Sequence, residues 1–365
     1  MSLNHLQEYK NNKELVAKLL RHIRAASHRE IRLMEVCGTH TVAIFRHGLR
    51  ELLPSNIRLL SGPGCPVCVT AMENIDEAIA AAELPGVILT TFGDMLKVPG
   101  SRSSLAEAKA GGADVRIVYS TMDALALAEH NPDKEVVFFG IGFETTAPTV
   151  AAAIITAAAR GTANFSVLGT HKLIPEAMRA IVQDKSIGVN GFICPGHVST
   201  IIGVTPYQFL AQEYGIPSVI TGFEAVDILQ AILMLIHQIE GGQAMVEIQY
   251  SRGVTPDGNP TARNLLAQVF QVEGSTWRGM GFIPGTGLAL RQEYAAFDAR
   301  KKLNLRIEAV IENSACKCGD ILRGLKVPHE CSLFAKVCTP EHPLGACMVS
   351  AEGTCAAYYK YGNRG

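Results

Sequence analysis

The sequence predicts an α/β fold made of two similar parallel-sheet α/β domains and a third, cysteine-rich domain at the C-terminus. Short apolar runs alternate with helical patterns of about 10 to 15 residues, which is typical of parallel sheets covered by helices on both faces. Most of these runs end in a turn that contains glycine. Six of the ten cysteines lie between Cys316 and Cys355, where the alternation has stopped.

The first α/β domain is expected over residues 31–130. Its predicted strands are residues 31–36, 57–60 and 87–91. They lead, in this order, into Cys37-Gly38-Thr39-His40, Gly62-Pro63-Gly64-Cys65-Pro66-Val67-Cys68 and Phe92-Gly93-Asp94. Functional groups of such sheets gather at the carboxyl ends of the strands, so we expect Cys37, Cys65 and Asp94 at one edge.

The second α/β domain, expected over residues 131–228, repeats this rhythm. Its predicted strands are residues 135–139, 165–168, 191–193 and 219–221. Glu144, His171 and His197 lie in the turns that follow the first three of these strands. Three of these residues are candidates for lining a cleft: Asp94, Glu144 and His197. The same residue types also occur in turns simply because they shape the turn.

The third domain is expected over residues 229–365. It begins with an apolar helix, continues through a region rich in glycine and proline, and ends in the cysteine-rich tail. The helical pattern within residues 1–30 has no clear partner in the first sheet, so we expect it to pack on this third domain.

Charge and hydropathy exclude two classes of partner. Lys and Arg number 33 against 34 Asp and Glu, so the net charge of -1 provides no field that would attract nucleic acid or an anionic membrane. The longest apolar stretches fall short of the ~20 residues that a membrane-spanning helix needs. The polar N-terminus lacks the features of a secretory signal, so a cytoplasmic location is expected.

Ten cysteines in a cytoplasmic chain favour metal binding or thiol redox chemistry, because structural disulfides rarely persist there. In the tail, Cys318, Cys331, Cys338 and Cys355 are separated by twelve, six and sixteen residues, without the paired C-x-x-C knuckles of a zinc ribbon. Four thiolates from separated loops satisfy an iron-sulfur cluster as well as a zinc ion, and spacing does not decide between them. Cys194 stands alone and is expected to be a small buried hydrophobic residue.

The early cysteines suggest an open site. Cys65 and Cys68 form a C-x-x-C pair that can close a reversible disulfide or supply half of a zinc site. With Cys37 they offer three thiols, which suits a site that binds a metal fragment and hands it on. Alternatively, Cys37 is a nucleophile and His40 its base.

The chain resembles the HypD family of hydrogenase maturation factors through long motifs in one order along nearly its whole length. These are Glu35-Val36-Cys37-Gly38-Thr39-His40, Gly62 to Cys68, Phe92-Gly93-Asp94, Gly142-Phe143-Glu144-Thr145-Thr146, Pro195-Gly196-His197-Val198-Ser199 and Glu352-Gly353-Thr354-Cys355-Ala356-Ala357. The resemblance implies two similar α/β domains plus an iron-sulfur cluster domain. It also implies a cytoplasmic scaffold that builds the Fe(CN)2CO unit of nickel-iron hydrogenases with the small chaperone HypC and accepts cyanide from the thiocyanate-carrying HypE.

The resemblance further assigns roles to individual residues. Cys37 would bind the iron fragment, and Cys65 and Cys68 would form a redox-active pair that can also bind iron. Cys318, Cys331, Cys338 and Cys355 would hold a 4Fe-4S cluster, with Cys316 and Cys347 as extra thiols that leave the fourth ligand open. His40 would orient or protonate a ligand. Two other functions remain as alternatives: an independent iron-sulfur thiol-disulfide oxidoreductase, and a zinc-stabilised binding module without redox chemistry.

Overall fold

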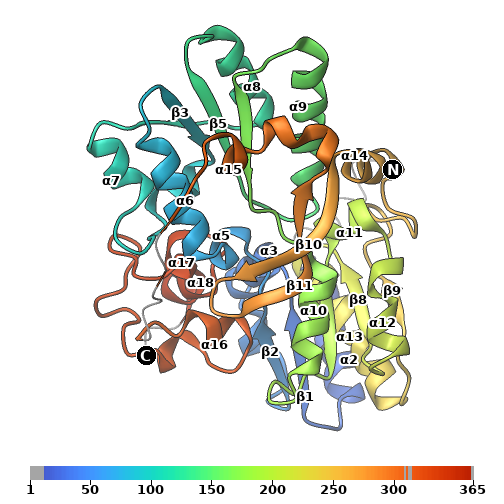
Figure 1. The fold of residues 1–365 in the computed structure, drawn as a ribbon. Coiled ribbons are helices and arrows are strands. Elements are labelled where there is room, and N and C mark those ends of the chain that lie inside the picture. The colour runs from blue at the N-terminus through green and yellow to red at the C-terminus, as the bar shows by residue number, and fades with distance from the viewer. Residues whose placement is uncertain (1–11, 308–309, 311–314, 363–365) are drawn as a thin grey trace.

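The computed structural model describes residues 12–307, 310 and 315–362 of the chain. It contains two parallel sheets and one antiparallel hairpin, which confirms the α/β class. The two sheets lie in different halves of the molecule and the cysteine-rich tail sits beside them (Figure 1). No helix in the described ranges has both the length and the apolar character needed to cross a membrane.

The first sheet has five parallel strands. Their order is β2 (Ile57–Ser61), β1 (Ile31–Glu35), β7 (Gly191–Pro195), β8 (Ser218–Thr221) and β9 (Val246–Ile248). One face is covered by α13 (Ala225–Glu240), α2 (Lys13–Ala26) and α3 (Gly38–Arg46), whose apolar side chains share one core with the strands. Because the other face is also buried, the strands read as nearly continuous apolar runs.

The second sheet has four parallel strands. Their order is β4 (Asp114–Ile117), β3 (Val87–Thr91), β5 (Glu135–Gly140) and β6 (Phe165–Gly169). Side chains of β3 alternate between two buried faces: Ile88 packs with α8 and α9, whereas Leu89 packs with α6 and α7. Helices on both faces are what the alternating sequence pattern predicts.

The other elements connect and cover these sheets. The further α-helices are α4 (Leu49–Leu52), α5 (Pro66–Val69), α6 (Met72–Ala82), α7 (Leu105–Ala110), α8 (Thr121–His130), α9 (Ala147–Arg160), α10 (Ile174–Gln183), α11 (Gly196–Ile202), α12 (Gln208–Gln212), α14 (Pro260–Val269), α15 (Ala299–Lys302), α16 (Cys318–Leu322), α17 (Ala346–Val349) and α18 (Thr354–Tyr361). The 3-10 helices are η1 (Gly93–Lys97), η2 (Thr205–Tyr207), η3 (Gln292–Phe297) and η4 (Pro328–Glu330).

Strand pairing differs from the expected chain order. We expected β3 to complete the sheet begun by β1 and β2, but it pairs with β4 and β5 in the second sheet. Strand β1 instead pairs with β7, so the first sheet crosses the expected ranges 31–130 and 131–228. Apolar runs locate strands, but hydrogen bonds between strands join residues far apart in sequence, and local pattern does not specify them.

Residues 270–290 form an antiparallel hairpin where we expected a looser region. Strand β10 (Phe270–Trp277) pairs with β11 (Gly281–Leu290), and the register of the pairing shifts between Glu273 and Ser275. The Arg278 N–H donates to the Val69 carbonyl over 3.0 Å, so the end of β10 is tied to α5.

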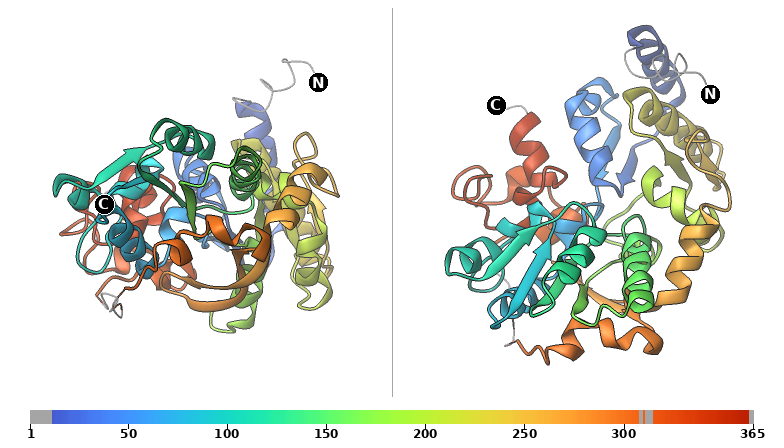
Figure 2. Two further views of the ribbon diagram at one scale, coloured as in Figure 1. Left: turned by 45° about the horizontal axis from the view of Figure 1, so that its top comes forward. Right: turned by 90° about the horizontal axis from the view of Figure 1, so that it is seen from above.

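The N-terminal helix and the tail lie on different sides of the molecule, as both views in Figure 2 show. Helix α2 packs against α13, at the start of the range expected for the third domain. In the tail, α17 packs against α5 and α18 packs against α3. The tail therefore rests on the two helices that begin at Cys37 and Cys65.

Candidate functional site

Cys37 ends the first strand and begins a helix. It is the N-cap of α3, and its side chain is buried. Burial raises the pKa of the Cys37 thiol to about 12, and the nearby backbone N–H groups of His40 and Thr39 only partly offset this effect. Cys37 is therefore a neutral thiol at the start of helix α3.

Cys65 and Cys68 occupy the corresponding place after β2. Cys65 is the N-cap of α5 and Pro66 is its first residue, where proline favours a helix start. The two cysteines form a disulfide with a Cα–Cα distance of 5.2 Å, and both are buried. The structure thus shows the disulfide that the C-x-x-C spacing permits, while its reversibility stays a prediction.

The two cysteine turns contact each other at the carboxyl edge of the first sheet. The Gly38 N–H donates to the Gly64 carbonyl over 2.9 Å, and the Gly62 N–H donates to the Glu35 carbonyl over 2.7 Å. A Cβ at position 64 would lie 2.1 Å from the Cys37 nitrogen, so only glycine fits there. The sheet therefore brings Cys37 beside the turn that carries the Cys65–Cys68 disulfide.

Glu35 is a buried carboxyl group that the sequence reasoning did not single out. Its Oε2 accepts the Cys37 N–H over 3.2 Å and its Oε1 accepts the Thr41 hydroxyl over 2.5 Å. Burial raises the pKa of Glu35 to about 7, although hydrogen bonds from Thr41 and Ser61 oppose the shift. The sequence does contain one sign of this residue, because Glu35 is a charged residue at the end of a mostly apolar strand.

The His40 ring contacts Gly222 and Phe223, which does not match the simple role of a base for Cys37. Its Nε2 lies 2.9 Å from the Gly222 carbonyl, and its ring stacks on Phe223 with centroids 4.8 Å apart. Burial lowers the pKa of His40 to about 4, so the ring is neutral. His40 faces the thiol through its backbone N–H, and its catalytic role stays a prediction.

The three candidate cleft residues have different surroundings. His197 follows β7, and its ring also stacks on Phe223, with centroids 3.9 Å apart. Glu144 is buried, accepts the Ile174 N–H over 2.9 Å with Oε1, and has no hydrogen-bond partner for Oε2. Asp94 is exposed in η1, at the end of a strand of the second sheet.

Tyr207 is a second residue that the sequence reasoning missed. It is fully buried, and its hydroxyl lies 3.3 Å from the Ser199 hydroxyl. Burial raises its pKa, and charges on Cys194, Glu144 and Cys37 would add to this shift. These residues come from both sheets, so Tyr207 marks where the halves meet. Cys194 is fully buried, as expected.

The tail cysteines gather in two adjoining groups. Cys331 and Cys338 are buried in a small apolar cluster, with Cys355 packed against it. Cys318 lies against Cys347, with 2.6 Å between their Sγ atoms, and Cys316 contacts Cys318. Cys347 also contacts Cys355, which links the groups. Within the described residues, no three His, Cys, Asp or Glu side chains are arranged to hold a single metal ion.

The tail also contacts the N-terminal cysteine turns directly. The Thr39 hydroxyl donates to Glu352 Oε1 over 2.6 Å, and a Cβ on Gly38 would lie 2.5 Å from the Glu352 Cβ. Cys68 Sγ lies 4.0 Å from the carbonyl oxygen of Ala346, the residue before Cys347. The early and late cysteines, far apart in sequence, are thus neighbours in the fold.

Comparison with known proteins agrees with this arrangement. The family model named HypD, described as "Hydrogenase formation hypA family", matches residues 14–362. The chain is 49% identical to hydrogenase maturation factor HypD of Rhizobium leguminosarum bv. viciae, over 99% of this chain and 96% of the relative. It is 46% identical to that of Escherichia coli K12, over 95% of each chain. The chain therefore belongs to the HypD family of hydrogenase maturation factors.

Proposed function

We propose that this protein is a cytoplasmic scaffold on which the Fe(CN)2CO unit of nickel-iron hydrogenases is assembled. The observation that carries the proposal is the contact between the Cys37 turn and the turn of the Cys65–Cys68 disulfide. This contact places a single thiol next to a two-electron redox pair. An assembly site needs both, one to hold the iron and one to supply electrons.

Cys37 is the residue that we propose holds the iron fragment. Thiolate sulfur is a soft ligand that suits iron carrying cyanide and carbon monoxide. The pKa of Cys37 is raised by burial, so the thiol keeps its proton until iron displaces it. The N–H groups at the start of α3 then face the negative charge of the bound thiolate. Cys65 and Cys68, once reduced, are further candidate ligands.

The Cys65–Cys68 pair supplies the electrons for cyanide release. Cleaving the sulfur–carbon bond of a thiocyanate group takes two electrons and one proton, and yields a thiol and a cyanide ion. Oxidation of the two thiols of Cys65 and Cys68 to their disulfide releases two electrons and two protons. The two electrons and one of the protons go to the thiocyanate group, the second proton goes to water or to the cyanide ion, and the step leaves the disulfide that the structure contains.

The tail fits an iron-sulfur cluster by the chemistry of its donors. Cys331, Cys338 and Cys355 share one apolar cluster and offer only sulfur ligands. Cys318 remains the proposed fourth ligand, with Cys316 and Cys347 as its competitors, because both of these side chains contact Cys318. A bound 4Fe-4S cluster would supply single electrons to return the Cys65–Cys68 disulfide to its dithiol form.

Two partners complete the proposal. The small chaperone HypC would share the iron fragment with Cys37, and the thiocyanate-carrying HypE would deliver cyanide. Nucleic acid and membranes are not part of it, because the net charge of -1 attracts neither.

Replacing Cys37 with serine tests the assignment of the iron ligand. Serine keeps the size of the side chain but stays protonated near neutral pH and binds such iron poorly. The purified chaperone complex should lose its cyanide and carbon monoxide infrared bands, while the visible absorption of the cluster remains. Cys194→Ala, at another buried cysteine, should keep both. Full-intensity bands in Cys37→Ser would show that other ligands hold the iron.

The disulfide also favours a second candidate, an independent thiol-disulfide oxidoreductase. In that case Cys37 would take no part in the reaction, and the Cys37→Ser variant would reduce the disulfides of substrate proteins at the wild-type rate. Measuring this rate beside the infrared spectrum of the same preparation separates the two functions.

A further inference from the structure

A buried lysine contacts a serine on the hairpin. Lys172 follows β6, and its side chain is only 1% exposed. Its Nζ donates to Ser275 Oγ over 2.6 Å, and its ammonium lies 5.9 Å from the Trp277 ring centroid. Among the described residues no carboxylate forms an ion pair with Lys172, which is unusual because a lone buried charge is strongly unfavourable.

Ser275 lines a cavity of about 340 Å³ between α6, the end of β6 and the hairpin. Ser275 lies where the pairing between the two hairpin strands changes register. Across the hairpin, Gly287 leaves room for it, since a Cβ there would lie 2.8 Å from the Ser275 Cβ. Ser275 is itself partly exposed, so a ligand in the cavity can reach it.

His171 is another residue that lines this cavity. The side chain is 2% exposed, and its Nε2 is buried without a hydrogen-bond partner. Burial lowers the pKa of His171 to about 4, so the imidazole is neutral. A neutral imidazole can donate one hydrogen bond to an oxygen that gains negative charge.

The surroundings of Lys172 favour its neutral amine. Burial lowers its pKa to about 8, the charge of Arg300 lowers it further, and the charge of Glu73 acts in the opposite direction. The neutral amine is the form that can accept a proton from a hydroxyl. Glu73 would then stabilise the ammonium ion that results.

We propose that Lys172 and Ser275 form a nucleophilic lysine–serine pair that takes acyl groups from small, uncharged esters or amides. The hydroxyl proton moves to the Lys172 amine, while Ser275 Oγ bonds to the carbonyl carbon. The bond to the leaving alcohol or amine then breaks, and that group takes the proton from Lys172. Water cleaves the acyl-serine ester and yields a carboxylic acid. His171 is the donor that we assign to the carbonyl oxygen.

The charge of the cavity selects the substrate class. Its wall contains Glu73 and Glu273, and the Glu77 carboxylate is paired with Arg300 over 2.8 Å. Carboxylates thus outnumber cations, so an anionic acyl compound would be repelled. The inference does not depend on the proposed assembly function, because no cysteine takes part.

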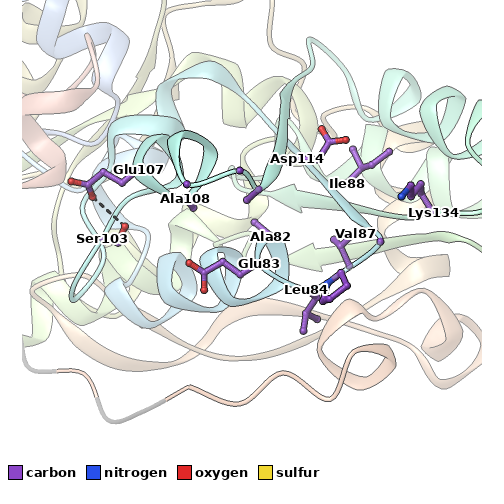
Figure 3. Close-up of a pocket in the computed structure, with 15 residues that line it drawn as sticks. Ala82, Glu83, Leu84, Val87, Ile88, Ser103, Glu107, Ala108, Asp114 and Lys134 are labelled. Atoms are coloured by element: carbon purple, nitrogen blue, oxygen red, sulfur yellow. Dashed lines mark hydrogen bonds between the residues drawn. The ribbon is translucent and has the colours of Figure 1, made fainter.

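An active-site probe for serine nucleophiles tests the pair in the full-length protein. A fluorophosphonate bonds to a reactive serine and releases fluoride, and peptide mass spectrometry locates the label. We expect label on Ser275, none at this position in Ser275→Ala, and at least 100-fold slower labelling in Lys172→Met. Ser103→Ala should label like the wild type, because Ser103 lines a different cavity and its hydroxyl donates to the Glu107 carboxylate (Figure 3) and to the Ser104 carbonyl.

The pH dependence provides a second test should Lys172→Met fail to fold, as judged by circular dichroism. Labelling of the wild type should rise about tenfold for each pH unit below the pKa of Lys172 and level off above it. Absence of label on Ser275, a flat pH profile, or wild-type labelling rates in folded Lys172→Met would each overturn the proposal.

Discussion

At the scale of single residues, the strongest constraint is the burial of carboxyl groups. Glu144 lies in the interior with one oxygen bonded to the Ile174 N–H and the other without a partner. Burial raises its pKa from 4.5 to about 7. The folded protein therefore binds this proton more tightly than the unfolded chain, so the stability of the fold decreases as the pH rises from about 4.5 to about 7.

Glu144→Gln should accordingly stabilise the protein at high pH. The shift corresponds to roughly 3 kcal/mol, fully present as stability below pH 4.5 and lost as the pH rises through 7. We expect the free energy of unfolding of Glu144→Gln to exceed that of the wild type by roughly this amount at pH 8. Urea unfolding of the wild type and of Glu144→Gln, each at pH 4.5 and at pH 8, measures the difference in the free energy of unfolding. An equal effect at pH 4.5 and pH 8 would show that packing, not charge, is responsible.

At the scale of elements, the contact between the two cysteine turns depends on glycine. A methyl group at position 64 would press on the Cys37 backbone, whereas one at position 93 would meet nothing closer than 3.7 Å. Gly64→Ala should therefore cost about 1–3 kcal/mol, as overpacking usually does, and Gly93→Ala much less. Thermal unfolding of the two variants checks this. Similar unfolding temperatures for the two variants would mean that the backbone around Cys37 can shift to accommodate the added methyl group.

The Cys65–Cys68 disulfide should open and close reversibly in the absence of iron. Both cysteines stand on one turn, so their sulfurs meet with little backbone movement. Alkylation across a redox titration, followed by mass spectrometry, should show the two protected together or modified together. Cys194 serves as the reference that stays reduced throughout. Two free thiols at every potential would contradict the electron-supplying role.

The sequence predicted the elements better than their pairing. Strands at residues 31–35, 87–91 and 135–140 lie where apolar runs and glycine turns indicated. The β1–β7 pairing and the hairpin were not foreseen, since hydrogen bonds between distant strands and a long glycine-rich hairpin leave no local periodic signal. The cysteines could be chosen as candidate site residues from their residue type alone. Glu35 and Tyr207 could not, because their properties depend on burial and on neighbouring groups that only the fold reveals.

At the scale of the whole molecule, the tail provides a test of the cluster. Cys331→Ala or Cys338→Ala should abolish the broad visible absorption of anaerobically purified protein, because a site that loses one of its thiolates rarely keeps its iron. Cys347→Ala should retain it. Comparing Cys316→Ala with Cys318→Ala identifies the fourth ligand. Zinc in place of iron and sulfide in the wild type would favour a zinc-stabilised module instead.

The order of strands in the first sheet also bears on how the chain folds. Strand β1 pairs with β7, whose residues follow about 160 positions later, after the entire second sheet has been made. Residues 87–169 can form a sheet from neighbouring segments, whereas the first sheet must close a long loop. During synthesis the second sheet can therefore assemble while β1 and β2 wait for β7. The cysteine turns gain their final surroundings last, when the tail leaves the ribosome, so an incomplete chain cannot present these turns in their final environment.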